Sequence, residues 1–284
     1  MHERYWGRND FMLQGPLDHG GFIETPPHEE ALARLNYLVE HRRRFGLMLG
    51  PVGTGKSIVL KAAAREAKRL GREVAAIDLF GIDSHDLLWQ LAVLSRLGPT
   101  ERWSRAALWR AVSDHWHALH SARLPSVLLL DHLERAEMDC LSLIERVLHL
   151  DVANDGGLTI LAAAREGLEE CSFGELAEQS ELRIELPCLT RRETEAFVGE
   201  LLGKSGHHRV TLRRDTLEAL FDLSGGVPRE IVRLCRLTLA AAERDILDEI
   251  DSAMLLDLAG ELPRVPRRHG ANDNALASLF AGQR

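Results

Sequence analysis

Long hydrophobic runs are missing from this sequence. No apolar stretch approaches the roughly 20 residues that a membrane-spanning helix requires. The start, from Met1 to Trp6, also lacks the apolar stretch of a signal peptide. We therefore expect a cytoplasmic protein with no membrane span.

Paired cysteines are missing as well. The four cysteines stand far apart and form no CxxC pair, so the spacing indicates neither a zinc site nor a disulfide framework. We expect reduced, mostly buried thiols at Cys140, Cys171, Cys188 and Cys235.

A surplus of positive charge is the third absence. The chain has 35 Lys and Arg against 43 Asp and Glu, which gives a formal net charge of -8. Coating nucleic acid non-specifically needs a surplus of cations, so that class of function is excluded, although a local basic patch is compatible with this total. Hydrophobic residues make up 45% of the 284 positions and charged residues 27%. This composition is typical of a globular protein with a substantial core.

Strand-like and helix-like segments alternate along the first two thirds of the chain. Apolar runs predict strands at 45–49, 73–79, 126–130, 158–163 and 182–186, and helical periodicity predicts helices at 28–44, 58–70, 84–97, 102–121, 141–148 and 174–179. This alternation is typical of a mostly parallel sheet that is covered by helices on both faces.

The flanking regions have a different character. Residues 1–27 are rich in Gly, Pro and Asp and predict an extended surface segment. After Pro187 we expect no further strands, and Thr190 and Glu193 form a capping-box signature at a helix start. We therefore predict an α/β domain over 28–187, a helical domain over 188–262 and a disordered tail over 263–284.

One motif predicts a phosphate site. The segment Gly50-Pro51-Val52-Gly53-Thr54-Gly55-Lys56-Ser57 matches GxxxxGK[ST] and lies between a predicted strand and a predicted helix. The glycines let backbone amides turn inward, and the helix N-terminus adds its dipole, so the loop can wrap a polyphosphate. Lys56 reaches the β- and γ-phosphates, and the Ser57 hydroxyl suits magnesium, which prefers oxygen ligands.

A second acidic element is expected at the end of a neighbouring buried strand. Asp131 follows the apolar run Val127-Leu128-Leu129-Leu130, and a carboxylate there can hold the water shell of the metal. We therefore predict Ser57 and Asp131 as the metal-binding residues for Mg²⁺. The lack of an obvious guanine-specificity motif favours ATP as the nucleotide.

With these pieces placed, the chain resembles the AAA+ ATPases of the ExeA, or general secretion pathway protein A, type and their relatives among transposition ATPases such as TniB and MuB. The likeness covers about residues 5 to 260. Beyond the phosphate loop, it is carried by the segment from Phe22 to Leu38, the strand ending at Asp131, Leu182-Arg183-Ile184, and Ser224-Gly225-Gly226-Val227-Pro228-Arg229. The resemblance implies a P-loop three-layer sandwich with a five-stranded parallel sheet, followed by a small α-helical lid.

The same resemblance implies roles for two arginines. Arg229 resembles the sensor 2 arginine that touches the γ-phosphate, and Arg183 resembles the arginine finger that reaches the nucleotide of a neighbouring subunit. A permanently charged guanidinium matches phosphate oxygens in a fork geometry, which supports both roles. Each arginine also has an alternative without a functional role. Arg229 would then be an exposed arginine at a helix start, and Arg183 a surface charge at the end of a strand.

The sequence departs from the family at the general base. Most members carry Asp-Glu at the end of the third strand, but here the order is Asp131-His132-Leu133-Glu134. A neutral imidazole at His132 can accept a proton but lacks the negative charge that orients water, so we expect slow hydrolysis. Glu134 is an alternative base, although residues two apart need not share a face. The fourth predicted strand also has no obvious Asn or Thr at its end, where the family carries its sensor 1 residue. Arg165 is the candidate to take that place.

Three functions are compatible with this site. The first is an assembly ATPase that forms ATP-dependent homo-oligomers and acts on an unidentified protein partner, with a secretion-apparatus-like role by analogy alone. The second is a DNA-associated ATPase of the transposition type that uses Arg42, Arg43 and Arg44. The third is a nucleotide switch with negligible turnover.

Overall fold

The computed structural model describes residues 23–150, 155–167, 173–204, 211–245 and 249–261. Most of the predicted N-terminal segment 1–27 and the whole of the predicted tail 263–284 lie outside the described residues. Within the described part of the segment, a helix already begins at Pro26. Proline suits the first turn of a helix, because its fixed φ is helical and its missing amide is not needed there.

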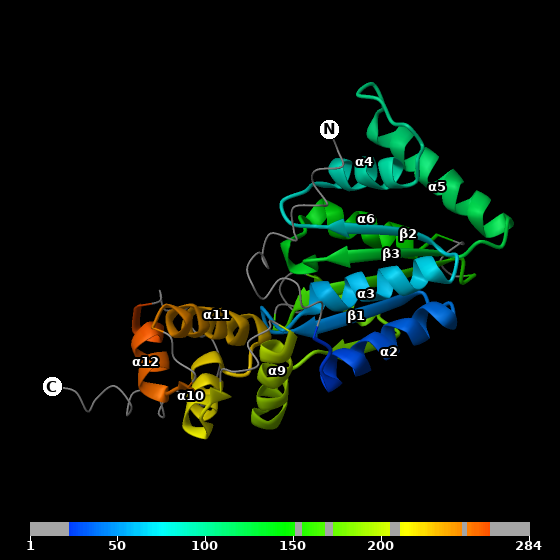
Figure 1. The fold of residues 1–284 in the computed structure, drawn as a ribbon. Helices are drawn as coiled ribbons and strands as arrows, with labels where there is room; N and C mark the ends of the chain where they lie inside the picture. The colour runs from blue at the N-terminus through cyan, green and yellow to red at the C-terminus, as the bar shows by residue number, and fades with distance from the viewer. Residues whose placement is uncertain (1–22, 151–154, 168–172, 205–210, 246–248, 262–284) are drawn as a thin grey trace.

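Strands and helices alternate in the first part of the chain (Figure 1). In chain order the elements are α2 (Pro26–Glu40), β1 (Phe45–Gly50), α3 (Lys56–Arg69), β2 (Glu73–Asp78), α4 (Ser84–Leu94), α5 (Arg105–Ser121), β3 (Ser126–Asp131), the 3-10 helix η2 (Leu133–Arg135), α6 (Met138–Leu148), β4 (Leu158–Arg165), α8 (Gly174–Glu178) and β5 (Leu182–Glu185).

Five parallel strands form the central sheet in the order β2-β3-β4-β1-β5. Strand β1 lies between β4 and β5, so that Met48 is opposite Ala163 on one side and Ile184 on the other. The carboxyl ends of parallel strands meet at one edge of the sheet, and this edge carries both the loop after Gly50 and the carboxylate of Asp131. The predicted five-stranded parallel sheet is confirmed.

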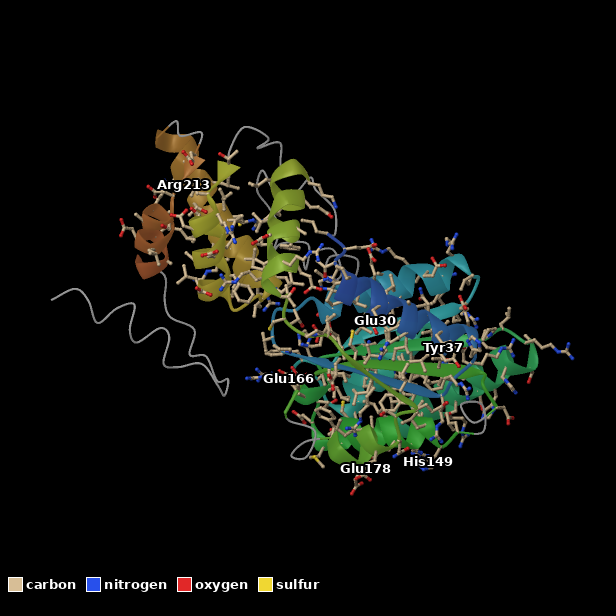
Figure 2. The ribbon with its side chains drawn as sticks, turned by 90° about the horizontal axis from the view of Figure 1, so that it is seen from below. Glu30, Tyr37, His149, Glu166, Glu178 and Arg213 are labelled. Atoms are coloured by element: carbon tan, nitrogen blue, oxygen red, sulfur yellow. The ribbon has the colours of Figure 1, made fainter. Side chains whose placement is uncertain are left out.

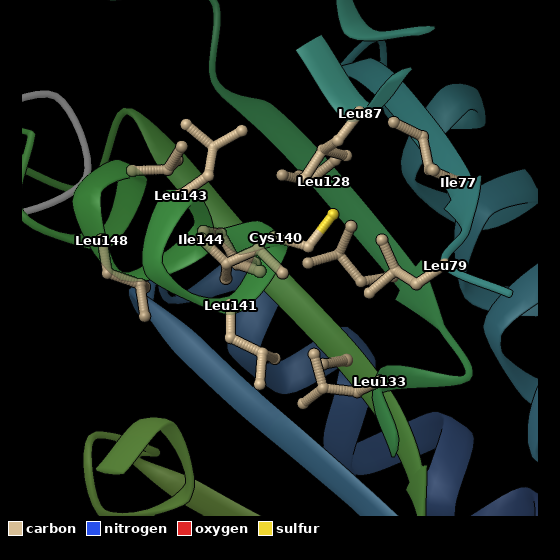
Figure 3. Packing of buried hydrophobic residues seen from close by; sticks show 14 of the residues in the cluster. Ile77, Leu79, Leu87, Leu128, Leu133, Cys140, Leu141, Leu143, Ile144 and Leu148 are labelled. Carbon is tan, nitrogen blue, oxygen red and sulfur yellow. The ribbon is translucent and has the colours of Figure 1, made fainter. Parts of the chain in front are cut away.

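The sheet has a separate hydrophobic core on each face, because successive side chains of a strand point to opposite sides. On one face α2 and α3 pack against a core that includes Met48, Leu129 and Ile184. On the other face, α4, α5, α6 and α8 pack against a core that includes Leu47 and Leu128. Figure 3 shows this second core, with the sulfur of Cys140 among leucine side chains. The three-layer arrangement of the prediction is therefore present.

The remaining part of the chain is mostly helical and is called here the helical portion. It comprises α9 (Arg191–Lys204), β6 (Thr211–Leu212), α10 (Arg214–Ser224), α11 (Pro228–Asp245), β7 (Glu249–Ile250) and α12 (Ser252–Glu261). The expectation of no strands after Pro187 was wrong, because β6 and β7 form a two-stranded parallel sheet. Strands of two residues are too short to show a hydrophobic period, so the sequence pattern misses them.

The first turn of α9 has the predicted capping geometry. The Thr190 hydroxyl accepts a hydrogen bond from the Glu193 amide at 3.3 Å, and the Glu193 carboxylate accepts one from the Thr190 amide at 2.8 Å.

A third core, which includes Ile23, Leu189, Phe197 and Ile231, holds the helical portion together. Along the described residues, no helix combines the length and the hydropathy that crossing a membrane demands.

Candidate nucleotide site

The loop between β1 and α3 has the backbone geometry of a phosphate cradle. Gly53 and Gly55 have φ values of +90° and +104°, a region that side chains other than glycine rarely adopt. Gly55 is the N-cap of the 14-residue helix α3, whose positive dipole end therefore opens into the loop. Within the loop, Pro51 and Thr54 are buried while Val52 is 53% exposed. The Thr54 hydroxyl closes the turn by donating to the Pro51 carbonyl at 3.0 Å.

The ammonium group of Lys56 lies inside this loop. Its Nζ donates to the carbonyl oxygens of Gly50 and Pro51, at 2.8 Å each. Burial lowers the pKa of Lys56, and the carboxylates of Glu134, Asp131 and Glu166 oppose that shift, in this order of strength. The loop thus holds a cation, and the carboxylates that raise its pKa lie at or just beyond the ends of β3 and β4.

Asp131 and Ser57, which the sequence predicts as metal ligands, lie at the end of β3 and at the start of α3. Asp131 is the last residue of β3, and its side chain is 20% exposed. Ser57 lies in the first turn of α3, which packs against β3. Among the residues that the structure describes, no group of three or more His, Cys, Asp and Glu could hold a metal by itself. A hydroxyl and one carboxylate, with phosphate oxygens and water completing the shell, are nevertheless the donor set that Mg²⁺ uses with nucleotides.

Glu134 lies beyond the end of β3, yet it is close enough to Lys56 to influence its pKa. It belongs to the 3-10 helix η2, and its Oε2 accepts the amide of Arg165, the last residue of β4, at 3.1 Å. This bond fixes the carboxylate beside β4, which is the strand between β3 and β1. Glu134 has the strongest acidic influence on the pKa of Lys56. The side chain of Arg165, the candidate for sensor 1, is half-buried.

His132 follows Asp131 in the chain, but its ring turns toward β2. Its backbone is left-handed, with a φ of 55°, and its Nδ1 lies 2.8 Å from Oδ1 of Asp78. This hydrogen bond raises the pKa of His132, against the opposing effect of burial. Burial alone would raise the pKa of Asp78, but the bonds from His132 and from the Phe80 amide hold it below its usual value. One ring nitrogen, Nδ1, is therefore engaged by an acidic partner on the strand next to β3.

The start of α11 touches the phosphate loop directly. The amide of Arg229 donates to the Gly53 carbonyl at 3.2 Å, and a Cβ added to Gly53 would lie 2.8 Å from Cγ1 of Val227. The guanidinium of Arg229 is close enough to contribute to lowering the pKa of Lys56. The structure therefore brings together the phosphate loop and the arginine with sensor 2 resemblance.

Arg183 lies apart from these residues. It is exposed and belongs to β5, the edge strand, where it stands opposite Leu47 in the body of β1. The register thus places it level with the middle of β1 and not with Gly50, where the loop begins. An exposed position on an edge strand leaves it accessible to another molecule.

Sequence reasoning missed three residues that contact or influence the site. Asp78 ends a strand as Asp131 does, so the same strand-end signal could have found it. Glu166 is exposed and directly follows β4, at the end of the sheet nearer the helical portion, whereas Tyr37 and His149 lie at the far end (Figure 2). His28 is 3% exposed and bonds the loop. No local signal marks His28, because its partner Thr54 is distant in sequence.

The fold and the loop together are those of P-loop proteins of the AAA+ class. A family model described as an AAA domain matches residues 39–171. The chain is also similar to general secretion pathway protein A of Aeromonas hydrophila, with 27% identity over 219 residues, which are 76% of this chain and 40% of that protein. The resemblance to the ExeA type of AAA+ ATPase is confirmed, and this chain spans only 40% of the length of that relative.

Solved structures with the same fold come from several organisms. Cdc6p from Pyrobaculum aerophilum has a TM-score of 0.67 and 16% identity, covering 85% of this chain and 68% of that one. The ORC1 protein of Aeropyrum pernix in complex with DNA has a TM-score of 0.64 and 17% identity, covering 89% and 69%. The RuvB Holliday junction branch migration motor of Thermotoga maritima has a TM-score of 0.54 and 16% identity, covering 84% and 70%. At such identities these likenesses support the fold alone.

Proposed function

We propose that this chain binds ATP with magnesium in the loop Gly50–Ser57 and hydrolyses it slowly. The observation that carries the proposal is the position of the Lys56 ammonium, which is held inside the loop at 2.8 Å from two carbonyl oxygens. Inward amides, a helix N-terminus and a fixed cation together favour a polyphosphate. Ser57 and Asp131 would hold the magnesium ion, which when bound neutralises charge on the β- and γ-phosphates.

We assign the general base to Glu134 in place of His132. The Glu134 carboxylate is close enough to the loop to influence the pKa of Lys56, whereas the ring of His132 turns toward Asp78 on β2. A general base must be able to reach the water that attacks the phosphate. One oxygen of Glu134 already accepts the Arg165 amide, which leaves the other oxygen for that water.

Two variants test nucleotide binding and turnover separately. Lys56→Ala should abolish Mg-ATP binding in calorimetry, because it removes the only loop side chain with a positive charge. Glu134→Gln should keep the affinity and lower phosphate release by about 100-fold or more. His132→Ala is the matched control and should retain most of the release. Wild-type affinity in Lys56→Ala would overturn the proposal, and binding without any release would instead identify a nucleotide switch.

We further propose that ATP-bound copies assemble in the cytoplasm and act on a partner protein. Arg183 is exposed on the edge strand and is not tied into the site of its own chain, which suits a residue that completes the site of a neighbouring copy. A secretion-related role rests on the similarity to general secretion pathway protein A. Light scattering with ATP, ADP and no nucleotide should reveal ATP-dependent oligomers that Arg183→Ala weakens. An ATP-independent mass would contradict assembly.

A cavity at the opposite end of the sheet favours DNA binding as a second candidate function. It has a volume of about 540 Å³ and is lined by Arg42, His120 and Arg123, among others. Arg43, in contrast, lies 3.6 Å from Glu181. Cations around a concave surface attract phosphate groups. This candidate requires DNA binding that weakens with salt and with the double change Arg42→Ala and Arg123→Ala. Binding unaffected by both would exclude it.

A further inference from the structure

Two consecutive carbonyl groups of the phosphate loop are held from outside by different parts of the chain. The Gly53 carbonyl accepts the Arg229 amide at 3.2 Å, at the start of α11. The next carbonyl, that of Thr54, accepts Nε2 of His28 at 2.7 Å, from the first turn of α2. The loop therefore bonds both to the helix that precedes β1 and to the helical portion.

These two bonds fix the direction of two backbone amides. All described peptide bonds are trans, and a planar trans peptide points its carbonyl and its N–H in opposite directions. Because the Gly53 and Thr54 carbonyls point outward to their partners, the amides of Thr54 and Gly55 point to the inner side of the loop. Inward amides are the donors that a phosphate group needs.

The His28 ring is itself fixed in one state. A carbonyl oxygen can only accept, so Nε2 carries the proton. Nδ1 lies 2.6 Å from the Thr25 hydroxyl and accepts a hydrogen bond from it. His28 and Thr25 are 3% and 4% exposed, and no side-chain capping bond is made by Thr25 at the start of α2. The hydroxyl of Thr25 thus orients the imidazole, and both ring nitrogens are engaged.

The imidazole also packs against the loop backbone. A Cβ added to Gly55 would lie 2.5 Å from Nε2 of His28, at a residue whose φ is +104°. A side chain at this position is therefore excluded by His28 as well as by the backbone conformation. The contact leaves the Thr54–Gly55 peptide little freedom to rotate.

We infer that His28 is a positioning residue of the phosphate site, and that Thr25 orients it. Neither touches the nucleotide: His28 holds the Thr54–Gly55 peptide so that the Gly55 amide meets a phosphate oxygen without reorganisation. The inference rests on the proposed binding of ATP. It assigns to helix α2 a part in nucleotide affinity.

Two substitutions at His28 test this role. His28→Leu fills a similar volume but cannot donate to Thr54, whereas the side-chain amide of His28→Gln can. In His28→Leu the Gly55 amide is no longer held in line with a phosphate oxygen. Loss of one well-aligned hydrogen bond to a charged group such as phosphate weakens affinity by roughly 10-fold or more. We expect the dissociation constant for Mg-ATP to rise at least about 10-fold in His28→Leu, and His28→Gln to recover most of the loss.

Further variants keep the test decisive. Thr25→Val leaves His28 in place but removes its orienting hydroxyl, and should weaken Mg-ATP binding to an intermediate degree even if His28→Leu fails to fold. Melting curves without nucleotide confirm that each variant is folded. Wild-type affinity in folded His28→Leu, or equal losses in the Leu and Gln variants, would overturn the inference. Lys56→Ala distinguishes failure of the proposed function from failure of this inference. If Lys56→Ala binds Mg-ATP normally, the proposed function fails. If Lys56→Ala loses binding while the His28 and Thr25 variants keep it, only the role of His28 fails.

Discussion

Nδ1 of His132 lies 2.8 Å from Oδ1 of Asp78, and this pair joins the end of β3 to the end of β2. The left-handed backbone at His132 directs the ring toward β2. His132 is therefore part of a contact between strand ends, while the carboxylate of Glu134 accepts the Arg165 amide at the end of β4.

A glutamate in place of His132 should not accelerate hydrolysis. In His132→Glu a second carboxylate would stand beside Asp78, and like charges at that distance repel each other. We expect unchanged or slower phosphate release, and a loss of stability below about 1 kcal/mol, because the side chains of His132 and Asp78 are 40% and 38% exposed. The matched variant His132→Gln avoids the repulsion. Faster phosphate release in His132→Glu would instead indicate that the general base acts from position 132.

Stability should fall on mild acidification because of His28. Burial lowers its pKa below 6.5, in spite of the opposing bond to Thr54 and the charge of Glu24. The folded chain therefore keeps the ring neutral while the unfolded chain takes up a proton below pH 6.5. The stabilising contribution is complete above pH 6.5 and is lost as the pH falls toward the folded pKa, by at most about 1.4 kcal/mol per pH unit.

Urea unfolding at pH 8.0 and pH 5.5 measures this dependence. The free energy of unfolding should decrease more between these values in the wild type than in His28→Gln, which has no titrating ring. Equal decreases in the two proteins would show that other groups account for the acid sensitivity.

Two of the cysteines should resist alkylation in the folded protein. Burial raises the pKa of Cys140 and Cys235 to about 12, and the thiolate is the reactive form. Cys188 is only partly buried, and burial raises its pKa as well. With iodoacetamide at pH 8, mass spectrometry should detect labelling at Cys188 before Cys140 or Cys235. Rapid native labelling of Cys140 would contradict its position in the core shown in Figure 3.

The two glycines before α11 should differ in their tolerance of alanine. Both have positive φ, 61° at Gly225 and 71° at Gly226, so each substitution costs about 1 kcal/mol for the conformation alone. A Cβ at Gly226 would also lie 2.1 Å from the Leu189 carbonyl oxygen, whereas nothing lies within 4 Å of one at Gly225.

Urea denaturation of Gly225→Ala and Gly226→Ala separates the two effects. Gly226→Ala should lose at least about 1 kcal/mol more than Gly225→Ala, because a clash with backbone forces the connection between β5 and α9 to move. Equal losses would mean that this connection adjusts without cost.

Much of the fold follows from local patterns in the sequence. The phosphate loop is predictable because its glycines, Lys56 and Ser57 are adjacent in the chain and stand between an apolar run and a helical pattern. Asp131 is predictable for the same reason, as it ends a buried strand. The parallel sheet follows from the alternation of strands and helices. Each of these features is encoded by residues close together in sequence.

The tertiary structure alone decides which side chains meet at the site. Glu134 reaches the loop because β4 lies between β3 and β1, so that the Arg165 amide at the end of β4 binds its carboxylate. His132 is drawn away because the neighbouring strand on its other side ends in Asp78. The order of strands in a sheet depends on long-range packing, and no local pattern records it. His28 reaches Thr54 through long-range packing as well, since α2 packs against α3 on the same face of the sheet.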